Sequence, residues 1–205
     1  HTNQGIFEAE AVLVAIGRRA NTAGLDLAKA GIETTERGYI RVDDRLRVND
    51  HIWAMGDVAG SPQFTFISLD DYRIVREQLL GEGRRRTGDR SVFATCVFTE
   101  PPLAQIGLTE SRARSKGHNI RTAVLPAAGI PKAQILRQTD GLLKAVIDVD
   151  SGLILGVTLF CAEAHELINL IKMAMDHDIK PEYLKNQIFT HPSMAEALND
   201  LFAAV

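Results

Sequence analysis

The sequence lacks the cysteine patterns that would assign it to several function classes. Its 205 residues contain two cysteines, Cys96 and Cys161, whose separation fits neither a CxxC redox pair nor a zinc knuckle. Six histidines are scattered without the spacing of metal ligands. We therefore expect no metal site, two thiols that serve as buried packing groups, and a reduced, cytoplasmic location.

Charge and hydropathy exclude two further classes. The net charge is −3, and the short arginine run at 84–86 is no basic excess, so we expect no nucleic-acid partner. No run of 18 or more apolar residues occurs, so we expect no membrane span. A hydrophobic content of 45% suits one or two globular domains with a core.

Several N-terminal features are also missing. The sequence has no initiator methionine and no signal peptide. A strand-like apolar run at 11–16 follows the first residues almost at once. We therefore expect the chain to be the C-terminal part of a longer protein.

Apolar runs and alternation predict two units separated by the polar, glycine- and arginine-rich residues 81–90. In the first unit the patterns predict a buried strand at 11–16, a helix or loop ending at Gly31, half-buried strands at 38–43 and 51–55, and a helix from Phe66 to Leu79. In the second they predict strands at 92–98, 119–125, 142–149 and 153–160, a hairpin turn at 150–152, helices at 109–117 and 163–176, and a short turn from Pro181.

The predicted helix at 163–176 is apolar over much of its circumference, so it needs cover on more than one side. Four of its residues are expected to cover a sheet, namely Leu167, Ile171, Ala174 and Met175. Three others are left for another partner, namely Ile168, Leu170 and Met173. A second subunit is one such partner, and the first ninety residues are the other.

Gly56 and Asp57 follow the predicted strand at 51–55. A glycine there allows close approach of a ligand, and the carboxylate can accept hydrogen bonds from sugar hydroxyls. Alone, the pair is more often just a turn. In the next helix, Asp70 and Asp71 are expected near the positive end of the dipole, and that helix N-terminus could face an anionic group.

Residues 189–196 place His191 five residues before a carboxylate, Glu196, and next to Pro192, which fixes the backbone. Histidine can take and give a proton near neutral pH, and a carboxylate on its other ring nitrogen fixes the tautomer. Ser193 and Glu196 also match a capping box that opens a helix. Spacing alone favours the structural interpretation.

Four segments, in order, resemble motifs of the class I, FAD-dependent pyridine nucleotide–disulfide oxidoreductases. They are VAIGRRAN at 14–21, IWAMGDV at 52–58, PPLAQIGLTE at 101–110 and HPSMAE at 191–196. Ala20 replaces the usual proline and Ser193 the usual threonine. Together they span essentially the whole chain.

Further segments are similar to one branch of that family. PQFTF at 62–66 resembles a segment of the mercuric reductases whose backbone lies against the flavin, with Thr65 at the flavin-contacting position. Those enzymes usually carry tyrosine where this chain has His191, and they end in a cysteine pair that is absent here. Residues 68–74 and 196–202 look most like the mercuric-reductase-like flavoproteins of reactive-chlorine resistance, which are linked to oxidant and copper stress.

The resemblance implies an α+β fold: a mostly antiparallel sheet with helices in a dimerisation domain, preceded by the returning part of an FAD/NAD(P)-binding α/β domain. It implies that 1–20 end the NAD(P)-binding domain, 21–90 are the second segment of the FAD-binding domain and 91–205 form the dimerisation domain.

The resemblance also implies a homodimeric oxidoreductase in which NAD(P)H reduces FAD and FAD reduces a CxxxxC disulfide. Gly56, Asp57 and Thr65 would contact FAD, and His191 with Glu196 would exchange protons with the partner subunit's redox cysteines. The substrate would be a small molecule, a metal ion or a disulfide. Because the sequence lacks CxxxxC and GxGxxG, the alternative is a catalytically inert dimerisation and flavin-contacting module.

Overall fold

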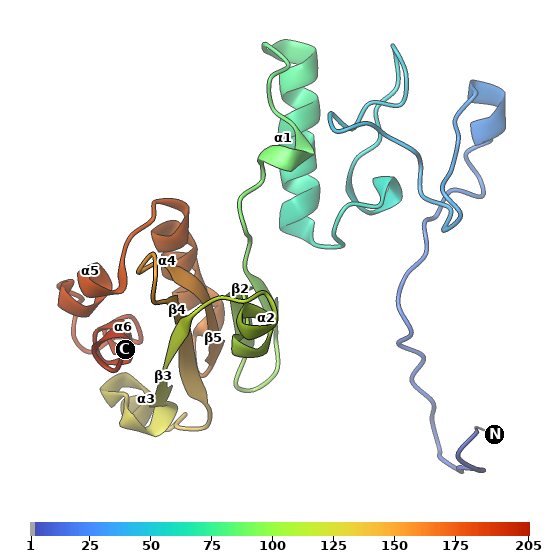
Figure 1. The fold of residues 1–205 in the computed structure, drawn as a ribbon. Helices are drawn as coiled ribbons and strands as arrows, with labels where there is room; N and C mark the ends of the chain where they lie inside the picture. Colours follow the sequence, from blue (N-terminus) through green and yellow to red (C-terminus); the bar gives the residue numbers. More distant parts are fainter. Residues whose placement is uncertain (1–2) are drawn as a thin grey trace. The chain divides into compact units, whose positions relative to one another are not determined.

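The computed structural model describes residues 3–205, which form two compact units. The first ends at Arg90, and the second runs from Ser91 to Val205 (Figure 1). The division falls at the end of the polar residues 81–90, where few buried apolar side chains occur. Within residues 3–205, no helix is both long and apolar enough to cross a membrane.

The second unit is built on a five-stranded antiparallel sheet with the strand order β1-β2-β5-β4-β3. Its strands are β1 Thr95–Val97, β2 Leu103–Gly107, β3 Ile120–Pro126, β4 Leu142–Asp148 and β5 Ile154–Phe160. A tight turn joins β4 to β5 where the sequence predicts a hairpin. The antiparallel sheet with its helices confirms the predicted α+β class.

Alternation along the strands gives the sheet two different faces. Leu143, Ala145 and Ile147 of β4 are buried in the main apolar core, whereas Lys144 between them points the other way. Helix α4, Ala164–Asp176, packs on β2 and β5, and α6, Ala197–Ala203, packs on β3 and β4. Helix α2, Glu110–Ser115, lies on the Lys144 side, where Glu110 pairs with that lysine at 2.5 Å.

Helix α4 confirms the prediction at 163–176 but corrects part of its buried face. Leu167, Ile171 and Ala174 are buried as expected, and Leu170 and Met173 are exposed as expected. Ile168 was expected to remain free for another partner, yet it is only 2% exposed. Its position three residues before Ile171 places it on the same helical face, against the core of the unit.

Two short helices in the second unit were not predicted as helices. They are α3, Pro131–Leu136, and α5, Pro181–Asn186. Each begins with a proline, whose fixed φ suits the first helical position and whose missing N–H costs nothing there. Pro181 was interpreted as the start of a turn because six residues are too few to show a helical period.

The first unit consists of helical turns and irregular chain. Its elements are η1 Leu27–Ala30, η2 Gly56–Ala59, α1 Thr65–Leu80 and η3 Thr87–Asp89. Helix α1 matches the predicted helix closely, and Gly31 ends η1 with a φ of 66° as its position suggested. The buried residues of this unit include Ile40, Leu46, Ala54, Ile67 and Ile74.

The strand predictions for the first unit are wrong. Residues 11–16 form no strand, and Val12, Leu13 and Ile16 are highly exposed. The predicted strands at 38–43 and 51–55 are reduced to the single bridges Thr34↔Ile40 and Arg47↔Trp53. A strand needs a neighbour to satisfy its backbone groups, and residues 3–205 supply no partner strand to 11–16.

Candidate functional site

The Gly56–Asp57 turn is held tightly against α1. Gly56 adopts a φ of 71°, and its N–H donates to Asp71 Oδ2 at 2.7 Å. A Cβ added to Gly56 would lie 2.9 Å from Ser68 Oγ of α1. Glycine is therefore favoured here by its left-handed backbone, and a Cβ would also require the Ser68 hydroxyl of α1 to move.

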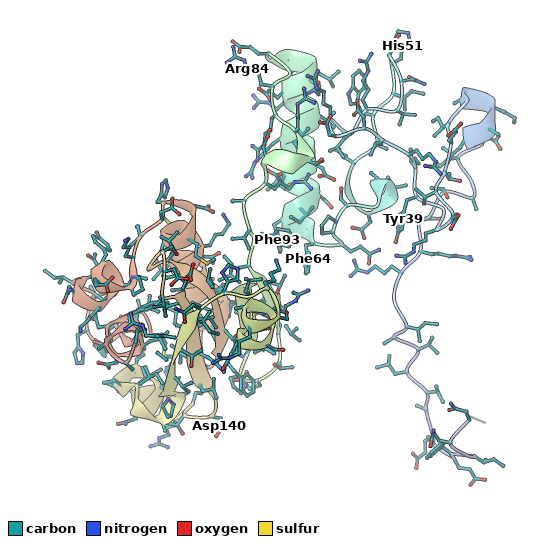
Figure 2. The ribbon with its side chains drawn as sticks, in the orientation of Figure 1. Tyr39, His51, Phe64, Arg84, Phe93 and Asp140 are labelled. Carbon is teal, nitrogen blue, oxygen red and sulfur yellow. The ribbon has the colours of Figure 1, made fainter. Side chains whose placement is uncertain are left out.

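Asp57 lies on the wall of a cavity of about 450 Å³ in the first unit. Its carboxylate is 45% exposed, and Arg18 Nη1 lies 3.2 Å from its Oδ2. Tyr39 lies beside η2, with its ring against Gly60 (Figure 2), and its hydroxyl accepts from Gln63 Nε2 at 3.3 Å. The lining residues are Arg18, Arg19, Ala20, Asn21, Tyr39, Asp57, Val58 and Gln63.

The cavity suits a ligand that carries hydroxyl groups. Its polar groups are a carboxylate that accepts, a guanidinium that donates, and amide and phenol groups that can do both. The Arg18–Asp57 pair is largely exposed, so it is weak and leaves the carboxylate free to exchange partners. The residues present therefore fit the polyhydroxyl chain of a flavin nucleotide.

Thr65 is the first residue of α1 and is exposed. The first backbone N–H groups of a helix have no partner within it, so this end of α1 can donate to a ligand. Phe64 and Phe66 flank Thr65, and their stacked rings have centroids 5.0 Å apart. Gly56 and Asp57 share one turn, while Thr65 opens the following helix in the same unit.

Asp70 and Asp71 have a different role from the one predicted. The sequence placed them early in the helix, near the positive end of its dipole; they occupy the second turn of α1 and are buried. Arg90 Nε donates to Asp70 Oδ2 at 2.8 Å, and Arg90 Nη2 pairs with Asp71. Arg85 also pairs with Asp70. The two aspartates therefore belong to a buried ion cluster and do not serve mainly to interact with the helix dipole. Arginines 15 to 20 residues later in the chain reach their carboxylates.

His191 and Glu196 form a direct pair in the second unit. His191 Nδ1 lies 2.8 Å from Glu196 Oε2, and the His191–Pro192 peptide bond is cis. The imidazole is 70% exposed, whereas Glu196 is only 17% exposed. An ionised carboxylate accepts from Nδ1–H, and in that tautomer of the neutral ring Nε2 is the proton acceptor.

The reciprocal bonds of the predicted Ser193–Glu196 capping box are present, but α6 begins only at Ala197, with Glu196 as its N-cap residue and no side-chain cap. Ser193 N–H donates to Glu196 Oε1, and Glu196 N–H donates to Ser193 Oγ, both at 3.3 Å. The Ser193 hydroxyl donates in turn to the Thr190 carbonyl at 2.6 Å. Glu196 therefore uses one oxygen for the capping box that precedes α6 and the other for His191, so its structural role fixes its orientation toward the imidazole.

Neither cysteine resembles a reactive redox centre. Burial raises the pKa of the Cys161 thiol to about 11, and burial also raises the pKa of Cys96. A thiol with a raised pKa is mostly protonated near neutral pH and is a poor nucleophile. Within residues 3–205, no group of three or more His, Cys, Asp or Glu side chains could hold a metal ion.

Sequence reasoning missed four residues near these sites. Arg18 lay within a quoted motif, but nothing in the sequence indicated its pairing with Asp57. Tyr39 and Gln63 line the same cavity, although they are 24 positions apart. Arg90 lies at the end of the polar segment 81–90, and its burial with Asp71 required the folded chain.

Comparison with known proteins gives two family matches. Residues 93–202 match the pyridine nucleotide-disulphide oxidoreductase dimerisation domain, and residues 1–71 match the pyridine nucleotide-disulphide oxidoreductase family.

Curated relatives match over nearly the whole of this chain. The probable pyridine nucleotide-disulfide oxidoreductase RclA of Escherichia coli is 50% identical over 206 residues, covering 100% of this chain and 47% of its own length. A mercuric reductase of Lysinibacillus sphaericus is 34% identical over 94% of this chain and 35% of its own length. This chain thus spans less than half the length of these relatives.

A solved structure agrees with these matches. The HOCl-induced flavoprotein disulfide reductase RclA from Escherichia coli superposes with a TM-score of 0.96 at 50% identity, over 100% of this chain and 47% of that one. Its Cu(II) complex gives the same TM-score and identity, over 100% of this chain and 48% of that one.

Proposed function

Because this chain belongs to the pyridine nucleotide-disulphide oxidoreductases, we propose that it forms the flavin-contacting and dimerisation part of a homodimeric, FAD-dependent NAD(P)H oxidoreductase. In this proposal residues 1–20 end an NAD(P)-binding domain, 21–90 return to the FAD-binding domain and 91–205 form the dimerisation domain. The observation that carries it is the pairing of His191 with Glu196 in a unit that matches the dimerisation domain.

The first unit supplies contacts to FAD. Asp57 accepts hydrogen bonds from the hydroxyls of the cofactor, Gly56 lets the backbone approach closely, and Thr65 presents the N-terminus of α1 to the flavin ring. When bound, FAD passes reducing equivalents from NAD(P)H to a redox disulfide. The positive end of α1 would stabilise negative charge on the flavin ring by about 0.3–1 kcal/mol.

The second unit supplies the acid–base group. His191 Nε2 takes a proton from, or returns one to, a redox cysteine of the partner subunit, while Glu196 holds Nδ1–H and stabilises the imidazolium. A thiolate is both the nucleophile and the leaving group in disulfide exchange, so its reactivity depends on such a proton partner. The segment is well built for this because Glu196 is fixed by its bond to Ser193.

The electron acceptor is a disulfide, a metal ion or an oxidant. The relatives of this chain include an HOCl-induced disulfide reductase, a Cu(II) complex of that protein and mercuric reductases. These relatives motivate the three classes of acceptor. The test is stopped-flow reduction of each class by the NAD(P)H-reduced complete enzyme. An acceptor that does not reoxidise the flavin is removed from the set.

The flavin contact is tested by Asp57→Ala in the complete enzyme. Losing a charged acceptor for the flavin hydroxyls should weaken FAD binding about 10- to 100-fold, because hydrogen bonds to charged groups contribute roughly 1.5–3 kcal/mol. The bound fraction is measured from the flavin absorbance after gel filtration. Unchanged flavin content at low protein concentration would count against the assignment of Asp57.

The acid–base pair is tested by Glu196→Gln with Ser193→Ala as its control. Glutamine retains the size of Glu196 but cannot stabilise the imidazolium, so the thiol-dependent half-reaction should slow about 10- to 100-fold. Ser193→Ala removes one bond of the capping box and leaves the His191–Glu196 pair, so it should slow the reaction far less. Equal effects would mean that Glu196 acts through the cap alone.

A second candidate is that this polypeptide is itself an inert binding and dimerisation module. The supporting observation is that its sequence contains no CxxxxC pair and no GxGxxG motif. This chain with added FAD and NADH should therefore show no NADH consumption at 340 nm. Measurable turnover would disprove this candidate.

A further inference from the structure

Asp71 is the most deeply buried charged side chain among the described residues of the first unit, with 0% of its surface exposed. Its two oxygens have different partners. Oδ2 accepts the Gly56 N–H at 2.7 Å, and Oδ1 pairs with Arg90, which is itself 13% exposed. An ionised group without exposure needs such full pairing, because an unpaired buried charge is very costly.

The neighbouring Asp70 provides a contrast. It pairs with Arg90 at 2.8 Å and with Arg85, and Arg73 lies 3.9 Å away. No hydrogen bond joins its side chain to η2 within the described part of the chain. Of these two adjacent acids on α1, therefore, Asp71 alone connects the arginine cluster to the turn that carries Asp57.

We propose that Asp71, held by Arg90, is a positioning residue that fixes the Gly56–Asp57 turn in its flavin-binding geometry; this rests on the flavin role proposed for Asp57. Gly56 and Asp57 are adjacent, so an acceptor fixed on the Gly56 N–H limits how far the Asp57 carboxylate can move. Gly56 is a glycine at a left-handed φ, and glycine is the most flexible residue, so the bond from its N–H to Asp71 supplies a restraint that its own backbone lacks. A buried, charge-assisted bond to a backbone N–H is stronger than a neutral one, which suits this role.

The test is a set of substitutions in the complete flavoprotein, with FAD affinity measured by titration of the apoprotein and stability by its thermal midpoint. Asp71→Ala should weaken FAD binding about tenfold or more, since it removes an acceptor with a charged partner. Asp71→Asn retains an amide oxygen for Gly56 N–H, so it should recover part of that loss. Asp70→Ala and Asp70→Asn remove the same charge from the same cluster and should leave the FAD affinity close to that of the unchanged protein.

The order of affinities decides the proposal. If Asp70 and Asp71 variants lose FAD affinity equally, in proportion to their thermal midpoints, the cluster is only structural and the positioning role is overturned. If Asp71→Ala does not fold, the comparison of Asp71→Asn with Asp70→Asn decides in the same way. Asp57→Ala separates the two proposals. Full FAD affinity in Asp57→Ala would overturn the assignment of Asp57 to the flavin site. Weakened FAD binding in Asp57→Ala, together with full FAD affinity in Asp71→Ala, would overturn the positioning role alone.

Discussion

The roles of three acidic side chains, Asp57, Asp71 and Glu196, follow from their exposure and their partners. Asp57 is half exposed beside an exposed arginine, so it can exchange that partner for a ligand. Asp71 is completely buried between a backbone N–H and Arg90, so it holds structure in place. Glu196 lies between these cases, with one oxygen on its own backbone segment and the other on His191.

At the same scale, we predict that Cys161 is inert in the folded protein. Burial raises its pKa to about 11, so at pH 8 about 0.1% is thiolate, against roughly a quarter for a free thiol with a pKa near 8.5. Labelling by a thiol reagent at pH 8 in a Cys96→Ser variant should be at least about a hundredfold slower than in the unfolded chain. Labelling at the unfolded rate would show that the site opens freely.

The same shift sets a dependence of stability on pH. Because the folded pKa of Cys161 is raised above its unfolded value, its stabilising contribution is complete below about pH 8.5 and declines as the pH rises toward 11. The free energy of unfolding, measured by denaturant titration between pH 7 and pH 10.5, should fall in this window. A Cys161→Ala variant should show a smaller decline over the same range.

At the scale of elements, the ends of strands are set by close backbone approaches. Gly107 ends β2 with a φ of 70°, and a Cβ there would lie 2.2 Å from the Leu155 carbonyl oxygen of β5. Leu108 N–H then donates to that same oxygen at 2.8 Å. Gly117 follows α2 with a similar φ of 81°, but a Cβ there would contact nothing within 4 Å.

This contrast predicts the outcome of two matched substitutions. Gly117→Ala should cost about 1–2 kcal/mol, because alanine is strained in the left-handed region. Gly107→Ala carries the same strain plus a clash between backbone atoms, so it should cost more than about 4 kcal/mol or prevent folding. Denaturant unfolding of both variants measures the difference, and equal costs would mean that β2 and β5 separate easily.

At the scale of the molecule, the second unit exposes apolar side chains on both sides of its sheet. Leu170 and Met173 of α4 are exposed, and the cross-strand row Val97, Leu103, Phe160 and Leu142 is partly exposed on the face opposite the core. Apolar surface of this kind is typical of obligate subunit interfaces, which bury more than about 2,000 Å² in total. These surfaces support the proposed homodimer.

We therefore expect this chain to form a species of twice its 22.5 kDa mass at micromolar concentration. Light scattering measures this mass directly. Met173→Glu should shift the species toward the monomer, because a buried carboxylate without a partner is costly. Ile135→Glu, at an exposed apolar position on α3, is the control and should leave the mass unchanged. If the chain without substitutions has the mass of a monomer by light scattering, the proposed dimer is wrong.

The proposed sharing of the active site between two subunits makes a separate prediction for the complete enzyme. His191→Ala and a redox-cysteine variant should each be inactive, because each lacks one half of the site. Mixed and allowed to exchange subunits, they should regain partial activity, since mixed dimers contain one intact site. Absence of activity despite exchange demonstrated by mass labelling would mean that His191 serves its own subunit.

Local patterns predicted most of the second unit. Alternation in β3, β4 and β5, the Asp150–Gly152 turn and the helical period of α4 are each visible within a single element of the chain. The first unit was predicted less well, because its apolar segments near 11–16, 38–43 and 51–55 depend on neighbours that lie elsewhere. An apolar run indicates a tendency to be buried, but a strand also requires a partner for its hydrogen bonds.

By itself, the sequence determined the family motifs. It also determined the position of the His191–Glu196 pair and of the Ser193–Glu196 bonds, since His191, Ser193 and Glu196 lie within six positions of one another. Only the tertiary structure decided that Asp71 is buried, that Arg90 reaches it and that Arg18 pairs with Asp57 across 39 residues. The physical reason is range. Capping and alternation act between chain neighbours, whereas the pairing of buried charges depends on which distant segments the fold brings into contact.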